Sequence, residues 1–331
     1  MTAPEASVVI PAYNAARTLV RTIESLFLQT ADSFEIIIVD DGSSDETPEI
    51  CETLQKDSPL PMKVLRQQNK GDCAARNRGV ESAEGEYVIF LDADDIAERE
   101  YVDRLVEAVG NDPACDIACC SFDLLYEDGS SRPRILPCER TGEILNGRFA
   151  LLKLLKEELD VWSGSGAYRR SCLVENGVYF DETLSMGGDT EFRWRAFYHA
   201  RKVALVKDVL VHYVQHYASV TRSFDPGRFP PSSWLDPEKF IEYLEEQGER
   251  GNDLLSLLRN EVVPRYTIRR LRNYVLYGLK DFFWRDISEG ATKEALRRGK
   301  KMFLQTPELA LKCFMALHLP GVFYNRYKRQ A

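Results

Sequence analysis

Short apolar runs alternate with amphipathic stretches through the first half of this 331-residue chain, and this alternation limits the possible folds more than any other feature. The apolar runs have the length of strands and span residues 7–11, 34–39, 62–65 and 87–91. Between the first two runs, Leu19, Ile23 and Leu26 recur at helical spacing. Strands that alternate with helices pair in parallel. The sequence therefore predicts an α/β fold with a mostly parallel sheet flanked by helices.

The second half of the chain predicts more of the sheet and then a change to helices. Further strands are expected at residues 116–122, 203–206 and 209–214, with a hairpin turn at 127–130 and helices at 101–109 and 189–199. Residues 224–237 are rich in proline, and helical patterns follow at residues 238–247, 252–286, 292–305 and 308–317. We therefore expect a sheet-containing domain over residues 1–225 and a helical region over residues 226–331.

Charge is distributed unevenly along the chain. The net charge is −9, but residues 256–331 contain 16 Lys and Arg against 6 Asp and Glu, a balance of +10, which leaves −19 for residues 1–255. The acidic part lacks the basic groove that a nucleic-acid-binding protein needs. The basic tail favours an anionic partner.

One stretch of the tail has an apolar stripe beside arginines. The stripe consists of Ile268, Leu271, Val275, Leu279 and Phe282, and Arg269, Arg270, Arg272 and Lys280 lie off it. Such a helix can lie on an anionic membrane surface, or it can pack inside the protein or against a second subunit. The sequence leaves these alternatives open.

The sequence favours a cytoplasmic location. We expect no export signal, because the first residues have neither the basic segment nor the apolar core of a signal peptide. No run reaches the roughly 20 apolar residues of a membrane span. The eight cysteines are then expected to be reduced thiols.

Acidic residues follow two of the predicted strands directly. The predicted strand at residues 87–91 is followed by Asp92-Ala93-Asp94-Asp95. The predicted strand at residues 34–39 is followed by Asp40-Asp41-Gly42-Ser43. Ligands of open α/β sheets bind outside the carboxyl ends of the strands. Clustered carboxylates there favour Mg²⁺ or Mn²⁺ together with substrate phosphates. The alternative for both segments is a solvated loop that caps the next helix.

A glycine turn and a fixed cation precede the fourth strand. Asn69-Lys70-Gly71 is followed by Arg76, which can bind a diphosphate through its guanidinium or pair with the nearby carboxylates. Neither G-x-G-x-x-G nor G-x-x-x-x-G-K-[ST] occurs in the chain. The sequence therefore lacks the fingerprints of dinucleotide and P-loop sites.

Taken together, four motifs resemble those of family 2 inverting glycosyltransferases of the GT-A fold, the type that builds bacterial surface polysaccharides. In chain order they are VVIPAYN (8–14), IVDDGSSD (38–45), NKG with ARNRG (69–79) and GEYVIFLDADD (85–95). The close similarity covers about residues 6–110 and weakens toward residue 225. It implies a Rossmann-like sheet with a nucleotide-binding half at about 1–110 and an acceptor-binding half at about 111–225.

The resemblance also implies roles for residues of the donor site. Pro11, Tyr13 and Asp41 occupy the positions of the nucleobase pocket, where Asp41 would face a uracil ring. Asp92 resembles the residue that contacts the ribose or the metal, Asp94 resembles the direct metal ligand, and Arg76 lies at the position near the diphosphate and sugar.

For the acceptor side, the resemblance places the catalytic base at Asp189. The family has a Glu before that residue, but this chain has Gly188, and Glu191 is the fallback base. Some members use a histidine after the last strand as a further metal ligand, and His216 is preferred here over His212. Trp162 falls in the acceptor loop, where it can stack on a sugar or belong to the core.

The resulting hypothesis is an inverting hexosyltransferase that depends on Mn²⁺ or Mg²⁺. It would move a sugar from a nucleotide-sugar, expected to be UDP-linked, to a hydroxyl of a glycan or lipid-linked glycan. It would work in the cytoplasm, at the inner face of the membrane if the basic helices bind there, and a homo-oligomer remains open. Two alternatives are a sugar-nucleotidyltransferase and a non-catalytic module that binds nucleotide-sugars or glycans.

Overall fold

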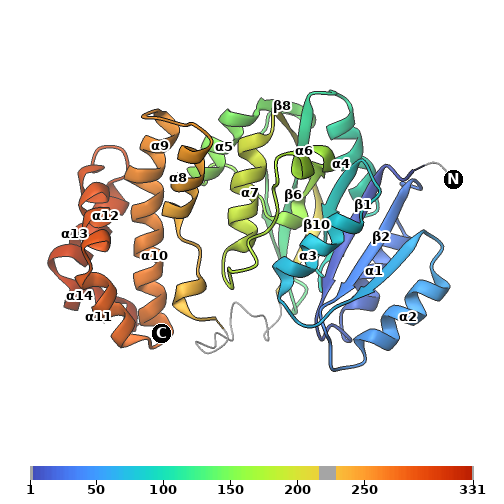
Figure 1. Ribbon diagram of the computed structural model, residues 1–331, viewed down its shortest axis with the longest axis horizontal. Coiled ribbons are helices and arrows are strands. Elements are labelled where there is room, and N and C mark those ends of the chain that lie inside the picture. Colours follow the sequence, from blue (N-terminus) through green and yellow to red (C-terminus); the bar gives the residue numbers. More distant parts are fainter. Residues whose placement is uncertain (1–2, 216–228, 330–331) are drawn as a thin grey trace. The chain divides into compact units, whose positions relative to one another are not determined.

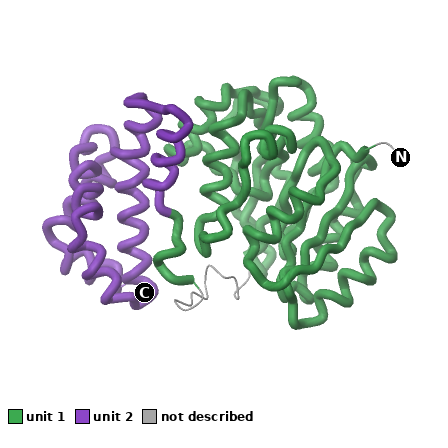
Figure 2. Tube along the Cα trace, in the orientation of Figure 1, with its two compact units in different colours: residues 1–235 green, residues 236–331 purple. Residues whose placement is uncertain are grey.

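The computed structural model describes residues 3–215 and 229–329, which form two compact units. Unit 1 comprises residues 1–235 and unit 2 comprises residues 236–331 (Figure 2). The division falls within the proline-rich segment. All of the sheet belongs to unit 1, whereas unit 2 is helical (Figure 1).

Unit 1 is built on a ten-stranded sheet. Its strands are β1 (Ala6–Ala12), β2 (Phe34–Asp40), β3 (Met62–Arg66), β4 (Tyr87–Phe90), β5 (Ile96–Ala97), β6 (Cys115–Tyr126), β7 (Ser131–Arg134), β8 (Glu143–Asn146), β9 (Gly166–Arg169) and β10 (Lys202–Gln215). The main path runs β3-β2-β1-β4-β9-β6-β10-β5, with β7 beside β6 and β8 beside β10. The first four strands in this order are parallel, as are β6 and β10. β9 is antiparallel to both of its neighbours.

Helices lie between many of these strands, and the two expected at residues 101–109 and 189–199 are among them. Those of unit 1 are α1 (Leu19–Phe27), α2 (Thr47–Asp57), α3 (Asp72–Ser82), α4 (Tyr101–Gly110), α5 (Gly147–Leu155), α6 (Arg170–Glu175) and α7 (Gly188–His199), with 3₁₀ turns η1 (Ser163–Ser165) and η2 (Pro231–Ser233). The expected hairpin joins β6 to β7. The two strands expected at 203–206 and 209–214 form one strand, β10, whose register shifts between Val206 and Val209.

The two faces of β1 are covered by different helices. Val8 and Ile10 belong to a buried cluster with Ile23 of α1 and Leu105 of α4. Val9 points to the other face, because side chains alternate along a strand, and there it meets Gly79 of α3. A Cβ at Gly79 would lie 2.1 Å from Val9 Cγ1, so only glycine lets α3 approach the sheet this closely.

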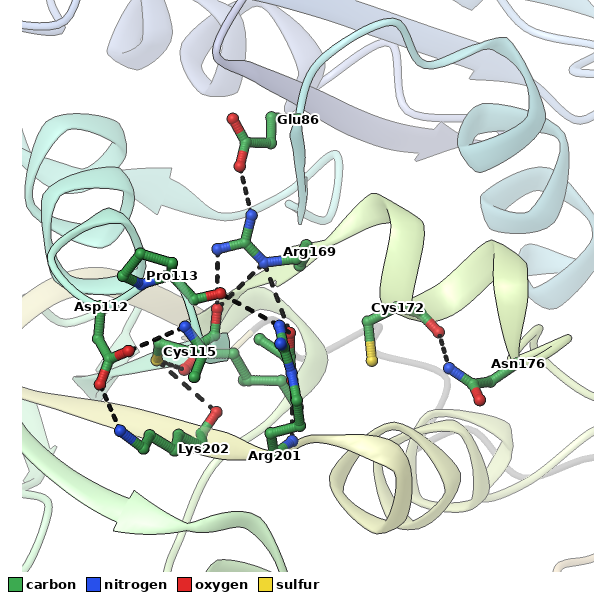
Figure 3. Close-up of polar contacts among 12 residues, drawn as sticks. Glu86, Asp112, Pro113, Cys115, Arg169, Cys172, Asn176, Arg201 and Lys202 are labelled. Carbon is green, nitrogen blue, oxygen red and sulfur yellow. Dashed lines mark hydrogen bonds and ion pairs between the residues drawn. The ribbon is translucent and has the colours of Figure 1, made fainter.

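A polar network ties three neighbouring strands together at the amino ends of β6 and β10. Arg169 of β9 donates to the carbonyl of Cys115 and is ion-paired with Glu86 (Figure 3). The buried Asp116 accepts from the backbone N–H of Arg201 at 2.8 Å and from its guanidinium at 2.6 Å. Figure 3 shows Arg201 and Lys202 beside the 112–115 turn. The network links β9, β6 and β10 to one another. None of its residues lines the cleft at the carboxyl ends of the strands.

Unit 2 consists of short packed helices. They are α8 (Pro237–Glu246), α9 (Asp253–Leu257), the π-helical segment η3 (Leu258–Val262), α10 (Val263–Leu276), α11 (Lys280–Ser288), α12 (Gly290–Lys301), α13 (Pro307–His318) and α14 (Pro320–Lys328). The prediction of a single helix over residues 252–286 is wrong. The observed helical stretch contains the π-helical segment η3 and ends with α10 at Leu276. Gly278, at φ +71°, then turns the chain into α11.

The apolar stripe of the basic tail packs inside unit 2. Ile268, Leu271 and Val275 are buried, and Arg270 pairs with the buried Asp286 at 2.7 Å. Leu279 and Phe282 are half-buried. Internal packing, one of the alternatives left open by the sequence, is therefore what the structure shows for the first three residues of the stripe. Across residues 3–215 and 229–329, no helix is both long and apolar enough to pass through a bilayer.

Candidate active site

A single cleft in unit 1 collects nearly all of the residues that the sequence singles out. It has a volume of about 1450 Å³ and opens at the carboxyl ends of β1, β2 and β4. Seven of the eight predicted site residues line it: Pro11, Tyr13, Asp41, Arg76, Asp92, Asp94 and Asp189. The eighth, His216, lies outside the described residues. Residues from four separate motifs thus share one cavity.

The loops after β1 and β2 are joined at the floor of the predicted nucleobase pocket. The backbone N–H of Asn14 donates to Ser43 Oγ at 2.9 Å, and Asn14 Oδ1 accepts from the N–H of Ser44 at 2.9 Å. Asn14 adopts φ +50°, a conformation that asparagine tolerates better than most residues. Tyr13 is thereby held at the exposed rim of the cleft.

Asp41 organises the loop beside this pocket. Its Oδ1 accepts from the N–H of Lys70 at 2.9 Å and from Gln67 Nε2 at 2.8 Å, and its Oδ2 accepts from the N–H of Gly71 at 2.8 Å. Gly42 has φ +75°, and a Cβ there would lie 2.8 Å from the backbone nitrogen of Asn69. The Asp41 carboxylate therefore shapes the 67–71 loop that lines the cleft. The spacing of residues in the sequence did not indicate this role of Asp41.

Arg76 is a buried cation between two carboxylates. Its Nη2 donates to Asp92 Oδ1 at 2.6 Å and its Nη1 is ion-paired with Asp72. Burial alone would lower the pKa of Arg76, but Asp92 and Asp72 outweigh it and raise the pKa. Its Nε has no hydrogen-bond partner among the described residues. The structure shows the carboxylate pairing, one of the two predicted alternatives, and the arginine also lines the cleft.

The acidic segment after β4 carries closely spaced negative charge. Asp92 and Asp94 are half-buried and line the cleft, whereas Asp95 is fully buried and accepts from the N–H of Val214 at 2.8 Å. Burial, followed by the charges of Asp92 and Asp94, raises the pKa of Asp95 well above its ordinary value. Its Oδ2 has no partner in the described part of the chain. Asp95 is therefore a buried structural group that holds β10, and not the solvated helix cap offered as the alternative for this segment.

This donor set fits a hard divalent cation that is completed by a substrate. Mg²⁺ is commonly held by one or two carboxylates together with substrate phosphates. Asp92 and Asp94 supply two carboxylates on the cleft wall, and the repulsion among the three aspartates would be relieved by a cation. Residues 3–215 and 229–329 contain no group of three or more His, Cys, Asp or Glu side chains that could hold a metal alone. The site would thus need the ligand's own oxygens.

Asp189 lies in the first turn of α7, on the cleft wall. Its carboxylate is 39% exposed, and its Oδ2 accepts from Arg193 Nη2 at 3.0 Å. Arg193 also donates to the carbonyl of Asp189 and to Thr190 Oγ1. One oxygen of the Asp189 carboxylate is thus engaged by a fixed donor on the same helix.

The neighbours of Asp189 explain the departure from the family motif. A Cβ at Gly188 would lie 2.5 Å from Cys73 Sγ, so this backbone position has no room for a glutamate side chain. Glu191, the fallback base, is buried and ion-paired with Arg195, and it is not among the cleft-lining residues. The geometry favours Asp189 over Glu191 as the reactive carboxylate.

Two stacked aromatic rings form another part of the cleft wall. Trp162 and Tyr213 lie with ring centroids 5.0 Å apart and planes 25° apart. A Cβ at Gly164 would lie 2.3 Å from the indole ring, which explains the small residue at that position. Trp162 also packs against the core, which is the one of the two predicted alternatives that the structure shows. A flat aromatic surface of this kind suits the apolar face of a sugar.

His212, the less favoured of the two candidate histidines, is engaged elsewhere. Its Nδ1 lies 2.7 Å from Asp123 Oδ1 and its Nε2 lies 2.8 Å from Glu98 Oε1. Burial alone would lower the pKa of His212, but the two carboxylates outweigh it and raise the pKa. Both ring nitrogens are occupied by protein partners, so His212 is a cross-strand link.

Comparison with known proteins decides the family. The family model described as "Glycosyl transferase family 2" matches residues 7–177, more than half of the chain. The chain belongs to glycosyl transferase family 2. The match spans the loops that carry Asp41, Arg76, Asp92 and Asp94 but ends before Asp189.

Curated relatives in this family come from several bacteria. The chain is 32% identical to "Putative glycosyltransferase EpsH" of Bacillus subtilis over 232 residues, which cover 69% of this chain and 66% of that protein. It is 42% identical to "Glycosyltransferase GlyG" of Streptococcus pneumoniae over 225 residues, which cover 66% of this chain and 73% of that protein. The match thus spans about two thirds of the length of EpsH. Both printed names are those of glycosyltransferases.

A solved structure shares the fold. The crystal structure of S. aureus TarS 1–349 in complex with UDP superposes with a TM-score of 0.67 at 21% identity, covering 98% of this chain and 89% of that chain. The predicted GT-A fold with a helical C-terminal region is confirmed by this likeness.

Two arginines at or behind the cleft wall of this family 2 chain were not predicted, and of these Arg21 lines the cleft. Arg21 donates to the backbone carbonyl of Asp94 at 3.2 Å, and Arg193 holds Asp189. The spacing of Arg193, four residues after Asp189 on a predicted helix, was a usable signal. Arg21 and its partner Asp94 are 73 residues apart in the sequence, and no local sequence pattern predicts such a contact.

Proposed function

We propose that this chain is an inverting, divalent-metal-dependent hexosyltransferase. It would move a sugar from a UDP-linked donor to a hydroxyl of a glycan or lipid-linked glycan. The observation that carries the proposal is the meeting, in one cleft, of a carboxylate pair, a buried arginine and a helix-held carboxylate from separate motifs. Family membership supports glycosyl transfer itself.

The donor half of the proposal rests on the β1, β2 and β4 loops. The 67–71 loop and the linked loops after β1 and β2 would enclose the nucleobase, and Arg76 would face the diphosphate. The choice of UDP is supported by TarS, whose structures include complexes with UDP and with UDP-GlcNAc. A relative's printed name, poly(ribitol-phosphate) beta-N-acetylglucosaminyltransferase, supports a hexosyl donor.

Asp92 and Asp94 would hold Mg²⁺ or Mn²⁺ together with the donor's phosphates. When bound, the ion would offset the negative charge that develops on the leaving nucleoside diphosphate. Arg76 adds a fixed positive charge on the same side of the cleft, and it needs no reorganisation because Asp72 and Asp92 already orient it.

Asp189 would act as the general base toward the acceptor. Its carboxylate would accept the proton of the acceptor hydroxyl as that oxygen attacks the anomeric carbon on the face opposite the leaving group. The bond to the nucleotide breaks as the new glycosidic bond forms, so the configuration inverts. Arg193 fixes the direction of the carboxylate, and the Trp162–Tyr213 stack offers a platform for the acceptor sugar.

A donor screen tests the proposal. Slow hydrolysis of UDP-, GDP-, CMP- and dTDP-sugars is measured with Mn²⁺ and with a chelator, for wild type and for Asp94→Asn. The matched control is Asp57→Asn, at the exposed end of α2. We expect metal-dependent hydrolysis of a UDP-sugar by wild type and the control, and its loss in Asp94→Asn.

The other outcomes separate the alternatives. Binding of a nucleotide-sugar without turnover would favour a non-catalytic module. Pyrophosphate release from a nucleoside triphosphate and a sugar phosphate would favour a sugar-nucleotidyltransferase. A hydrolysis rate that changes neither with the chelator nor with Asp94→Asn would contradict the proposed metal site.

A further inference from the structure

Exposed apolar side chains are concentrated near the end of unit 2. Of the fourteen large exposed hydrophobic residues in the described chain, six fall within twenty residues. They are Phe303, Leu304, Leu311, Phe314, Leu319 and Val322, called here the α13 apolar surface. Leu304 is 90% exposed, an extreme value for a leucine. Single exposed apolar residues are ordinary, but six of them within twenty residues of one helical segment are not.

The cluster follows from the two faces of α13. Ala310, Cys313 and Ala316 are buried, and a Cβ at Gly299 of α12 would lie 2.6 Å from Cys313 Sγ, so this face packs tightly inside unit 2. Leu311 and Phe314 lie off this buried face and are 53% and 43% exposed. Packing within the unit therefore leaves two apolar side chains of the same helix partly uncovered by the described residues.

Basic groups border these apolar side chains. The ring centroids of His318 and Phe314 lie 4.8 Å apart, and His318 Nε2 lies 3.2 Å from Lys300 Nζ. Arg326 Nη1 lies 3.9 Å from Sδ of Met315, the residue after Phe314. Residues 290–331 contain nine Lys and Arg against two Asp and Glu, a net charge of +7. Apolar side chains bordered by Lys and Arg are typical of surfaces that lie in the headgroup region of an anionic bilayer.

We propose that the α13 apolar surface binds an anionic lipid membrane. Its apolar side chains would enter the boundary between headgroups and acyl chains, and the surrounding cations would pair with acidic headgroups. A symmetric dimer through this face is disfavoured, because it would bring two segments of charge +7 together. The surface differs from the α10 stripe suggested by the sequence pattern, which is buried.

Vesicle co-sedimentation of the full chain tests this proposal without donor or acceptor, so its outcome is independent of the proposed function. Binding to phosphatidylcholine vesicles is compared with binding to vesicles that also contain phosphatidylglycerol, at low and high salt. The test variant is Leu304→Ser/Leu311→Ser/Phe314→Ser. The matched control, Leu28→Ser/Ile135→Ser/Phe149→Ser, changes three similarly exposed residues of unit 1.

We expect salt-sensitive binding to the anionic vesicles, retained by the control and weakened at least about tenfold in the test variant. Lys301→Gln/Lys328→Gln should weaken binding mainly at low salt. Thermal unfolding of each variant checks that the fold is kept. Equal binding by wild type and the test variant would overturn the proposal. The proposal would also be overturned if the protein did not bind vesicles but self-associated, or captured an acidic protein, through these three residues.

Discussion

At the residue scale, the most informative position is Gly188, where the family motif has a glutamate. The structure explains this departure by the closeness of α3, because Cys73 Sγ occupies the space that a Cβ at residue 188 would need. The cleft thereby gains volume beside Asp189, since both Gly188 and Cys73 line it. The missing glutamate is therefore a packing feature of this chain.

Gly188→Ala should destabilise the protein by about 1–3 kcal/mol, the usual cost of an extra methyl group in a closely packed site. The cost should shrink in a Cys73→Ala background, because the sulfur atom that causes the clash is then absent. Denaturant unfolding of the four proteins in this double-mutant cycle measures the coupling. An equal cost of Gly188→Ala in both backgrounds would show that Cys73 is not the obstacle.

Asp189→Asn should lower the rate of transfer or donor hydrolysis by about 10²–10⁴-fold, because the amide cannot accept the proton from the acceptor. Donor affinity should not change, since the proposed donor contacts lie on the β1, β2 and β4 loops. Steady-state rates and UDP affinity are measured on the same samples. Glu191→Gln is the control, and its rate should stay near that of wild type. A large loss in Glu191→Gln with little loss in Asp189→Asn would reverse the assignment.

At the scale of elements, strands and their loops were predictable, whereas interruptions within helices were not. Strands β1, β2 and β4 are continuous apolar runs because both of their faces are covered, and such runs are visible in a sequence. The break after α10 depends on Gly278, one glycine within a helical pattern that otherwise continues to Asp286. Whether such a glycine ends a helix depends on tertiary packing.

His212 provides a pH-dependent link between elements, since it joins β10 to Asp123 of β6 and to Glu98 after β5. Because its pKa is raised above 6.5 in the folded protein, its contribution to stability is complete below pH 6.5 and is lost as pH rises through the folded pKa. Unfolding free energies of wild type and His212→Asn should therefore converge between about pH 6 and about pH 9. A difference that stays constant over this range would contradict the link.

At the scale of the whole molecule, local motifs predicted the composition of the cleft better than its internal contacts. The parallel strand order brings Asp41, Arg76 and Asp92 to one sheet edge, as a βα pattern implies. The pairing of Arg76 with both Asp72 and Asp92 depends on side-chain directions that no spacing rule fixes. In unit 2, the sequence indicated a basic amphipathic region, but only packing shows which apolar face is buried.

The measurement that tests the central claim most directly is the anomeric configuration of the first sugar released from a donor. A UDP-sugar with an α linkage is hydrolysed with Mn²⁺ and followed by proton NMR before the sugar equilibrates in water. Attack from the face opposite the nucleotide, assisted by Asp189, predicts that the β anomer appears first and that Asp189→Asn slows its formation by about 10²–10⁴-fold. Initial release of the α anomer, or equal release by the variant, would contradict the account.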